Sequence, residues 1–362
     1  MTLLSHGRGD FMAKVYKDYF DIAHMIEYAK KNNVTFVFCC STDDQRGCGK
    51  TYSSSKYLYE HALKGEKFMI FVREVKELGH IAEGVFSSYL ADTHPDTIVY
   101  EKKQDNIFSF VYHQVGTGDE KETEIIGFVA PLKVARNLKQ YRGIFQSANV
   151  RYFYMDEFMP LDGRYLPDEP SLMKTIYDTV NGKIENLPII MTANCINLQN
   201  PYFSLPGVRL NSKVQSNTRS IKTDTYIYEN VCVQGLSEKH INSGINKAFG
   251  LDNESYLSNV WIGDNDSLVS KCDDFGRAVY IATLVYNNQK MALLEYPNVG
   301  LFYISRKVDG TCKYIYNLTM DGDLNIPLLK TCPLLKRLKD WFYSGRVRVS
   351  DGAIQRILLD IF

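Results

Sequence analysis

The chain has 362 residues, enough for two domains rather than one, and its 45% hydrophobic content is sufficient for sizeable cores. Lys and Arg total 42, as do Asp and Glu, so any attraction to nucleic acid must come from local patches rather than from net charge. No apolar run approaches a membrane span, no signal-peptide core is found, and the eight cysteines include no C-x-x-C pair, so a reducing compartment is expected, with no membrane partner, zinc site or disulfide framework.

The first informative segment in chain order is a phosphate-loop pattern at residues 34–64, where an apolar strand leads into a polar loop and then a helix. Gly47 and Gly49 let backbone N–H groups turn toward nucleotide phosphates, and the helix presents the positive end of its dipole to them. The spacing places Lys50 at the β- and γ-phosphates and the Thr51 hydroxyl at Mg²⁺. The predicted ATP-binding residues are Arg46, Gly47, Cys48, Gly49, Lys50, Thr51 and Tyr52.

The next hundred residues alternate strand and helix patterns, which is typical of a parallel α/β sheet. A polar turn interrupts them at Gly116–Glu122. The expected elements are a strand at Lys67–Arg73, a helix at Glu74–Leu90, and strands at Ile98–Tyr100, Asn106–Tyr112 and Ile125–Pro131.

A second half of an ATPase site is predicted at Val150–Phe158, a mostly apolar strand that ends in adjacent carboxylates. At the end of a parallel strand, Asp156 is placed to hold the water shell of Mg²⁺, and Glu157 to polarise the attacking water as general base. A solvated acidic turn is the ordinary alternative for such a pair, and the phosphate loop upstream makes it the weaker one.

A third element follows a predicted helix at Pro170–Val180. The apolar run Leu187–Met191 changes abruptly to small polar residues at Thr192 and Asn194. Ligands of open α/β sheets bind at such strand ends, so either side chain is a candidate to contact the γ-phosphate or the attacking water, and a simple turn cap remains an equal alternative.

The C-terminal part differs in character. The segment from about Val208 is polar and basic, and Ser237–Phe249 has the pattern of a connecting helix. Consecutive strands and then two helices predict a small α+β domain at Val279–Tyr286, Met291–Tyr296, Leu301–Ser305, Pro333–Tyr343 and Asp351–Ile361.

Motifs along almost the whole chain resemble those of the DNA-packaging ATPases, or encapsidation proteins, of small tailed bacteriophages of the phi29-like type. Several have no part in nucleotide binding, which makes the resemblance more specific than a phosphate loop alone. The shared motifs are Arg46-Gly-x-Gly-Lys50, Val72-Arg73, Ala130-Pro131-Leu132, Asp156-Glu157-Phe158, Tyr165-x-Pro167, Asp178-Thr179-Val180, Asn194, Asn200-Pro-Tyr-Phe203, Trp261-Ile-Gly-Asp264, Val285-Tyr286-Asn287 and Gly300-Leu-x-Tyr-Ile304.

The resemblance implies an ASCE-type P-loop ATPase domain at 1–235, a linker helix region at 236–258 and a C-terminal RNase H-like domain without working nuclease chemistry at 259–362. It further implies ATP and Mg²⁺ as cofactors and a homo-oligomeric ring, expected to be a pentamer. This ring would sit at the portal of an empty capsid in the host cytoplasm, attached transiently while it pumps double-stranded DNA inward. Whether a packaging RNA also takes part is left open by the sequence.

The chain departs from its relatives in two places. Asp44 replaces the first glycine of the usual phosphate-loop pattern, and Lys183 is the nearest cation where relatives carry an arginine after the Asp-Thr-Val stretch. A γ-phosphate at a subunit interface needs positive charge from the neighbouring subunit, so Lys183 is the predicted trans-acting residue. Arg164, Arg209 and Arg219 are the alternatives.

Contact with DNA phosphates is predicted for a basic C-terminal group, whose members equally suit the solvated faces of two helices: Lys336, Arg337, Lys339, Arg346 and Arg348. Two rival functions remain. A small-molecule kinase would show no DNA stimulation of hydrolysis. A terminase-like ATPase with an active C-terminal nuclease would need two metals held by acids among Asp264, Asp266, Asp273, Asp274, Asp321 and Asp323.

Overall fold

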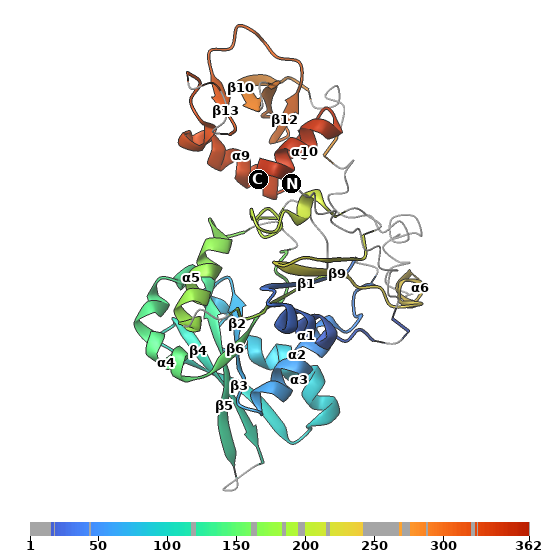
Figure 1. Cartoon of the computed structure of the whole chain (residues 1–362), viewed down its shortest axis with the longest axis vertical. Helices are drawn as coiled ribbons and strands as arrows, with labels where there is room; N and C mark the ends of the chain where they lie inside the picture. Colours follow the sequence, from blue (N-terminus) through green and yellow to red (C-terminus); the bar gives the residue numbers. More distant parts are fainter. Residues whose placement is uncertain are drawn as a thin grey trace, which may run out of the picture.

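The computed structural model describes residues 16–17, 19–42, 45–116, 121–160, 165–182, 186–194, 200–214, 218–241, 268–269, 276–286, 289–319, 323 and 325–361. These residues build two sheets, one in each part of the chain (Figure 1). The larger sheet belongs to the N-terminal part, and the smaller one lies above it in the view, with the C-terminal helices between the two.

The N-terminal sheet has nine strands among the described residues. From β5 to β9 in the sheet order, every neighbouring pair is parallel, whereas β3, β4 and β8 pair antiparallel at the two edges. The predicted parallel core is therefore confirmed, and the antiparallel edges were not foreseen. In sheet order the strands are β3 (Thr97–Gln104), β4 (Phe108–Val115), β5 (Glu122–Pro131), β2 (Lys67–Val72), β6 (Val150–Met155), β7 (Ile189–Ala193), β1 (Phe36–Cys40), β9 (Tyr226–Asn230) and β8 (Ser220–Lys222).

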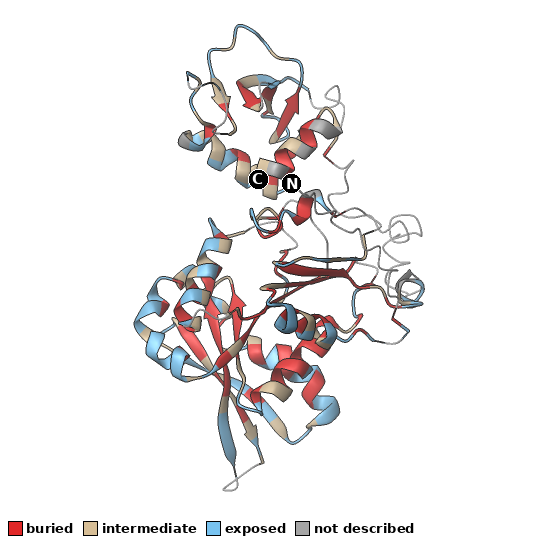
Figure 2. Ribbon diagram, in the orientation of Figure 1, coloured by how far each residue is buried: buried red, intermediate tan, exposed pale blue. Residues whose placement is uncertain are grey.

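Helices cover both faces of this sheet, which is why its central strands are almost continuously apolar and buried (Figure 2). One face packs on α1 (Ala23–Asn32), α2 (Lys50–Ala62) and α3 (Ile81–Thr93). The opposite face packs on α4 (Arg142–Ser147) and α5 (Glu169–Asn181). In open sheets of this kind, ligands bind at the carboxyl ends of the parallel strands.

The helix predicted at Glu74–Leu90 is wrong in its first part. The chain forms a short 3₁₀ turn, η2 (Val75–Glu77), and then starts α3 anew at Ile81. Gly79 separates them with a φ of +104°, a left-handed conformation that favours glycine. Residues 77, 80 and 81 thereby line one side of a cavity at the end of β2.

The C-terminal sheet has the order β13-β10-β11-β12-β14. Its first three strands in the sequence are antiparallel neighbours, and the short strands at both edges pair in parallel. The predicted strands and the two final helices are confirmed; the edge strands were too short to recognise. The elements are β10 (Val279–Tyr286), β11 (Gln289–Tyr296), β12 (Leu301–Ser305), β13 (Ile315–Asn317), α9 (Pro333–Tyr343), β14 (Val347–Val349) and α10 (Gly352–Ile361).

The two parts meet where α10 contacts the segment after β7 and where α9 contacts Tyr165, between β6 and α5. Asn211 is buried and donates its side-chain N–H to the Leu359 carbonyl at 2.6 Å. Tyr343 meets Tyr165 edge to face, with ring centroids 6.1 Å apart. The predicted connecting helix is described only at its start, as α6 (Leu236–Ile241), and its remainder lies outside the described residues. Among the described helices, none combines the length and apolarity that crossing a membrane requires.

Candidate nucleotide site

The candidate site is built where three parallel strands end side by side. β7 lies between β1 and β6, with Cys40 opposite Ala193 and Met155 opposite Met191. The phosphate loop follows β1, the carboxylate pair follows β6, and the Thr/Asn element ends β7. Three predictions made from separate stretches of sequence therefore converge on one sheet edge.

The phosphate loop owes its shape to two glycines with positive φ, Gly47 at +79° and Gly49 at +100°. Gly49 is also crowded, since a Cβ would lie 3.4 Å from the Phe20 carbonyl oxygen and 3.4 Å from Tyr19 Cβ. The Phe20 N–H donates to the Cys48 carbonyl at 3.0 Å, which ties the segment before α1 to the loop. Helix α2 starts directly after Gly49 and directs its first backbone N–H groups toward the loop, an arrangement suited to phosphate.

Lys50 begins α2, and its side chain is 4% exposed. Its ammonium donates to Ser41 Oγ at 2.5 Å, to Asn194 Oδ1 at 3.0 Å and to Cys48 Sγ at 3.4 Å. The three partners are a hydroxyl, a thiol and an amide, which are neutral groups. An anion such as a phosphate would therefore stabilise the buried Lys50 ammonium further. The two predicted catalytic residues Lys50 and Asn194 are thus in direct contact.

Asp156, at the end of β6, is surrounded by donors. Its carboxylate accepts from Thr51 Oγ1 at 3.0 Å, from Thr192 Oγ1 at 2.5 Å and from the Glu157 N–H at 3.0 Å. Burial, followed by the Asp156 charge, raises the pKa of the neighbouring Tyr154 well above its usual range. A carboxylate beside a threonine hydroxyl is a set of hard oxygen ligands, so the predicted pair Thr51 and Asp156 fits Mg²⁺.

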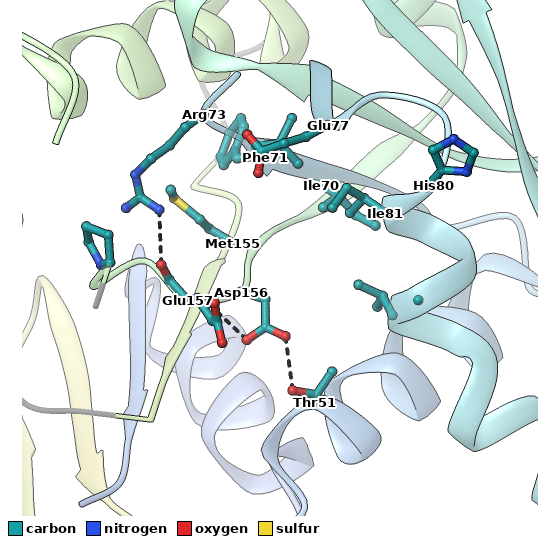
Figure 3. A pocket seen from close by; sticks show the side chains of 14 residues that line it. Thr51, Ile70, Phe71, Arg73, Glu77, His80, Ile81, Met155, Asp156 and Glu157 are labelled. Atoms are coloured by element: carbon teal, nitrogen blue, oxygen red, sulfur yellow. Dashed lines mark hydrogen bonds between the residues drawn. The ribbon is translucent and has the colours of Figure 1, made fainter. Parts of the chain in front are cut away.

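Glu157 has a φ of +48°, which is unusual for a residue with a side chain, and it is exposed. It borders a cavity of about 510 Å³ between the ends of β2 and β6 and the start of α3. Figure 3 shows Thr51, Asp156 and Glu157 on one side of this cavity and Arg73, Glu77 and His80 on another. The predicted base therefore faces open volume next to the phosphate loop, where a water molecule and the γ-phosphate are expected.

A family model of podovirus DNA encapsidation proteins (Gp16) matches residues 18–362. The chain belongs to this family. The DNA packaging protein of Bacillus phage phi29 is 26% identical over 333 residues, covering 88% of this chain and 91% of that protein. That of Bacillus phage B103 is 23% identical over 332 residues, covering 88% of this chain and 94% of that protein. The solved structure of the Phi-28 gp11 DNA packaging motor matches with a TM-score of 0.50 and 15% identity over 94% of this chain and 96% of that chain, a likeness of fold alone.

The remaining loop residues of this encapsidation protein are placed as follows. Arg46 is exposed and Cys48 is buried beside Lys50. Tyr52 packs edge to face on Tyr89 of α3 with centroids 5.7 Å apart, and burial and Asp92 raise its pKa. Its ring is thus engaged on α3, which leaves its backbone N–H as the group available to a phosphate.

The predicted trans-acting Lys183, the alternative Arg164 and the substituted Asp44 all lie outside the described residues. Arg209 is exposed with a φ of +45°, and Arg219 is half-buried. The identity of a residue acting between subunits therefore stays a prediction.

The predicted DNA-binding group is divided by its contacts. Arg337 is paired with Glu295 and lies over the rings of Phe302 and Trp341, at 5.0 and 4.6 Å from their centroids. Arg348 is half-buried, donates to the Gly345 and Val347 carbonyls, and has a pKa lowered by burial. Lys336 and Arg346 are exposed, as is the paired Arg337, and Lys339 is half-buried.

Of the acids that a C-terminal nuclease would need, only Asp323 is among the described residues. Its carboxylate accepts from the backbone and side-chain N–H groups of Asn325 at 2.9 and 3.0 Å, as in an ordinary turn. Within the described ranges there is no group of three His, Cys, Asp or Glu side chains that could hold a metal ion.

Sequence reasoning gave no role to three residues that the fold brings to the site: Arg73 after β2, Glu169 at the start of α5, and Tyr202. Glu169 is completely buried and Arg73 is paired with it. A signal existed, because a buried parallel strand that ends in an arginine places a costly charge at the ligand edge. The partner, 96 positions away in the sequence, carried no matching signal.

Proposed function

We propose that this protein is the ATPase of a viral DNA packaging motor, which couples ATP hydrolysis to movement of double-stranded DNA into a preformed capsid. The observation that carries the proposal is the contact of the buried Lys50 ammonium with Asn194 beside the Thr51–Asp156 pair. These contacts join the phosphate loop, the carboxylate pair and the Thr/Asn element in one site. Such a site can bind the phosphates, the Mg²⁺ ion and the attacking water of an ATPase. Because the chain belongs to the family of DNA encapsidation proteins, we take DNA to be the molecule that the motor moves.

The chemistry follows from the positions of the side chains. Lys50 and the N-terminal N–H groups of α2 bind the β- and γ-phosphates and stabilise the charge that spreads over the γ-phosphate oxygens. Glu157 orients a water molecule in the cavity and accepts its proton as the water oxygen bonds to phosphorus and the bond to the ADP oxygen breaks. Asn194, next to Lys50, donates from its amide to the γ-phosphate or to that water.

Thr51 and Asp156 would hold Mg²⁺, which would neutralise charge on the phosphate oxygens. Thr192 holds the other oxygen of the Asp156 carboxylate and so fixes its orientation toward Thr51. This makes Thr192 a support of the metal site, whereas Asn194 takes the contact nearer the γ-phosphate.

Assembly into a homo-oligomeric ring, a pentamer, on the portal of the procapsid in the host cytoplasm is part of the proposal, with a packaging RNA as an open partner. In such a ring Lys183 supplies positive charge to the neighbouring subunit's γ-phosphate. The C-terminal domain is RNase H-like, which its antiparallel first three strands with added parallel edges support. It contacts DNA phosphates through Lys336, Lys339 and Arg346 and has no nuclease activity.

The deciding experiment measures ATP hydrolysis with and without double-stranded DNA over a range of protein concentrations. Hydrolysis that rises with DNA and with assembly supports the motor, and DNA-independent transfer of phosphate to a small molecule would establish a kinase instead. Glu157→Gln should retain Mg²⁺-ATP binding and hydrolyse ATP about 100-fold more slowly, the scale of losing a general base. Metal-dependent cleavage of the DNA in the same mixtures would establish the terminase-like alternative.

A further inference from the structure

A buried ion pair lies directly behind the catalytic turn. Glu169, in the first turn of α5, is 0% exposed, and Arg73, immediately after β2, is 18% exposed. The guanidinium donates from Nε to Glu169 Oε2 at 3.1 Å, and its Nη2 forms an ion pair with Oε1 at 3.0 Å. Glu169 also accepts from the Tyr202 hydroxyl at 2.8 Å and from the Leu166 N–H at 2.9 Å. Both carboxylate oxygens are therefore satisfied, and the arginine fork is held in one orientation.

The other edge of the same guanidinium faces the turn that follows Asp156. Arg73 donates from Nη1 to the Glu157 carbonyl at 3.1 Å and from Nη2 to the Phe158 carbonyl at 2.6 Å. Figure 3 shows this side chain reaching from the end of β2 across the cavity to Glu157. Since Arg73 lies at the end of β2 and Glu157 after β6, the pair links the ends of two neighbouring strands.

Glu157 is thereby held by its backbone on both sides. Its N–H donates to Asp156 Oδ1 at 3.0 Å, and its C=O accepts from Arg73. Its φ of +48° lies in the left-handed region, which a glutamate occupies only when its surroundings hold it there. The direction of the Cα–Cβ bond of the proposed base is set by these two contacts.

We propose that Arg73, oriented by Glu169, is a positioning residue that fixes the direction of the Glu157 side chain and so sets the rate of hydrolysis without contributing to ATP affinity. The proposal rests on the proposed role of Glu157 as general base. Arg73 touches the backbone of the turn and not the phosphate loop, so its removal leaves the contacts of Lys50 and Thr51 in place.

Lysine cannot perform this task, although it carries the same charge. Arg73 donates one hydrogen bond to the Glu169 carboxylate and two to the carbonyls of the turn, and its Nη2 also forms an ion pair with the second carboxylate oxygen. The planar fork supplies these contacts in two directions together. A lysine ammonium can keep the Glu169 charge paired but cannot reach both carbonyls at the same time. Arg73→Lys therefore separates positioning from the stability of the buried pair.

The test compares Arg73→Lys with Arg136→Lys, a matched change at an exposed arginine of the same domain. In DNA-stimulated hydrolysis by the full chain, Arg73→Lys should lower kcat by about 10- to 100-fold, the range expected when a reacting group is misplaced by about 1 Å. The ATP dissociation constant, measured by calorimetry in a Glu157→Gln background, should change less than about threefold. A kcat within about threefold of the Arg136→Lys control would overturn the proposal.

A double-variant cycle distinguishes positioning from a general loss of structure. If Arg73 acts through Glu157, adding Arg73→Lys to Glu157→Gln should slow single-turnover hydrolysis no further. A full additional loss in that background would overturn the proposal. The double change Arg73→Gln with Glu169→Gln removes both buried charges at once, leaves none unpaired, and should reproduce the loss of kcat in a folded protein. Near wild-type activity of Glu157→Gln alone would instead show that the proposed base, and with it the basis of this inference, is wrong.

Discussion

The stability of the N-terminal domain should depend strongly on the single carboxylate of Glu169. Each of its oxygens lies in contact with the Arg73 guanidinium and accepts one hydrogen bond from a neutral donor, Tyr202 or the Leu166 N–H. In Glu169→Gln, an NH₂ group replaces one of these oxygens. The favoured amide orientation turns the NH₂ group toward Tyr202, whose hydroxyl can accept as well as donate. The contact of that position with the Arg73 guanidinium is then lost, and an arginine N–H faces the amide N–H.

Losing the charged bond costs about 1.5–3 kcal/mol, and leaving a buried donor unsatisfied costs about 1–3 kcal/mol more. Because Arg73 is 18% exposed and can recover part of its loss from water, we expect about 3 kcal/mol in the free energy of unfolding. With a urea dependence of about 3 kcal/mol per molar, the unfolding midpoint followed by circular dichroism should fall by about 1 M.

The matched control is Lys174→Ala on the same helix α5. It removes an exposed pair with Asp178, whose groups lie 2.5 Å apart, and this pair should contribute no more than about 0.5 kcal/mol. The reasoning is refuted if Glu169→Gln shifts the midpoint no further than Lys174→Ala does.

Lys50→Ala should abolish ATP turnover while circular dichroism stays unchanged, and Lys56→Ala, at an exposed position of the same helix, should leave turnover intact; hydrolysis at the wild-type rate in the first would remove the phosphate-loop assignment. Gly49→Ala should also prevent ATP binding in calorimetry, because φ is +100° and the new Cβ meets Phe20; normal binding would contradict the geometry of the loop. Lys336→Ala should weaken DNA binding and reduce the slope of log K against log salt concentration by about one unit. Arg348→Ala should change this slope little, because the Arg348 guanidinium donates to the Gly345 carbonyl of its own turn; equal slopes for the two variants would contradict the division.

The parts of the site that were predictable from the sequence are those written in short local patterns. The phosphate loop, the Asp156–Glu157 pair and Asn194 each follow an apolar strand, so the position of every group was given by its own neighbours in the chain. The structure brings these three elements together at adjacent strand ends. The order of the strands, including the place of β7 between β1 and β6, is a tertiary result that no local pattern contains.

Residues whose role depends on a distant partner were missed. Glu169, beside Pro170 in the first turn of a helix, has the sequence context of an ordinary exposed helix start, yet it is buried because Arg73 and Tyr202 arrive from other elements. The helix expected from Glu74 was interrupted for a similar reason, since Glu101 on β3 accepts from the Gly79 and Ala82 N–H groups at the start of α3. In both cases packing between elements overrode a local preference.

The joint between the two domains has a mechanical consequence. In the part of the chain that the structure describes, the contact between the domains includes the Asn211–Leu359 hydrogen bond and the edge-to-face contact of Tyr343 with Tyr165. Each of the two sheets, by contrast, has a buried apolar core. Relative motion is the ordinary expectation for two domains of one chain that meet at such a contact. The centroid of the Tyr165 ring, which Tyr343 contacts, lies 5.6 Å from the Arg73 guanidinium. A tilt of the C-terminal domain therefore moves a ring that packs on Arg73, the residue that contacts the Glu157 carbonyl.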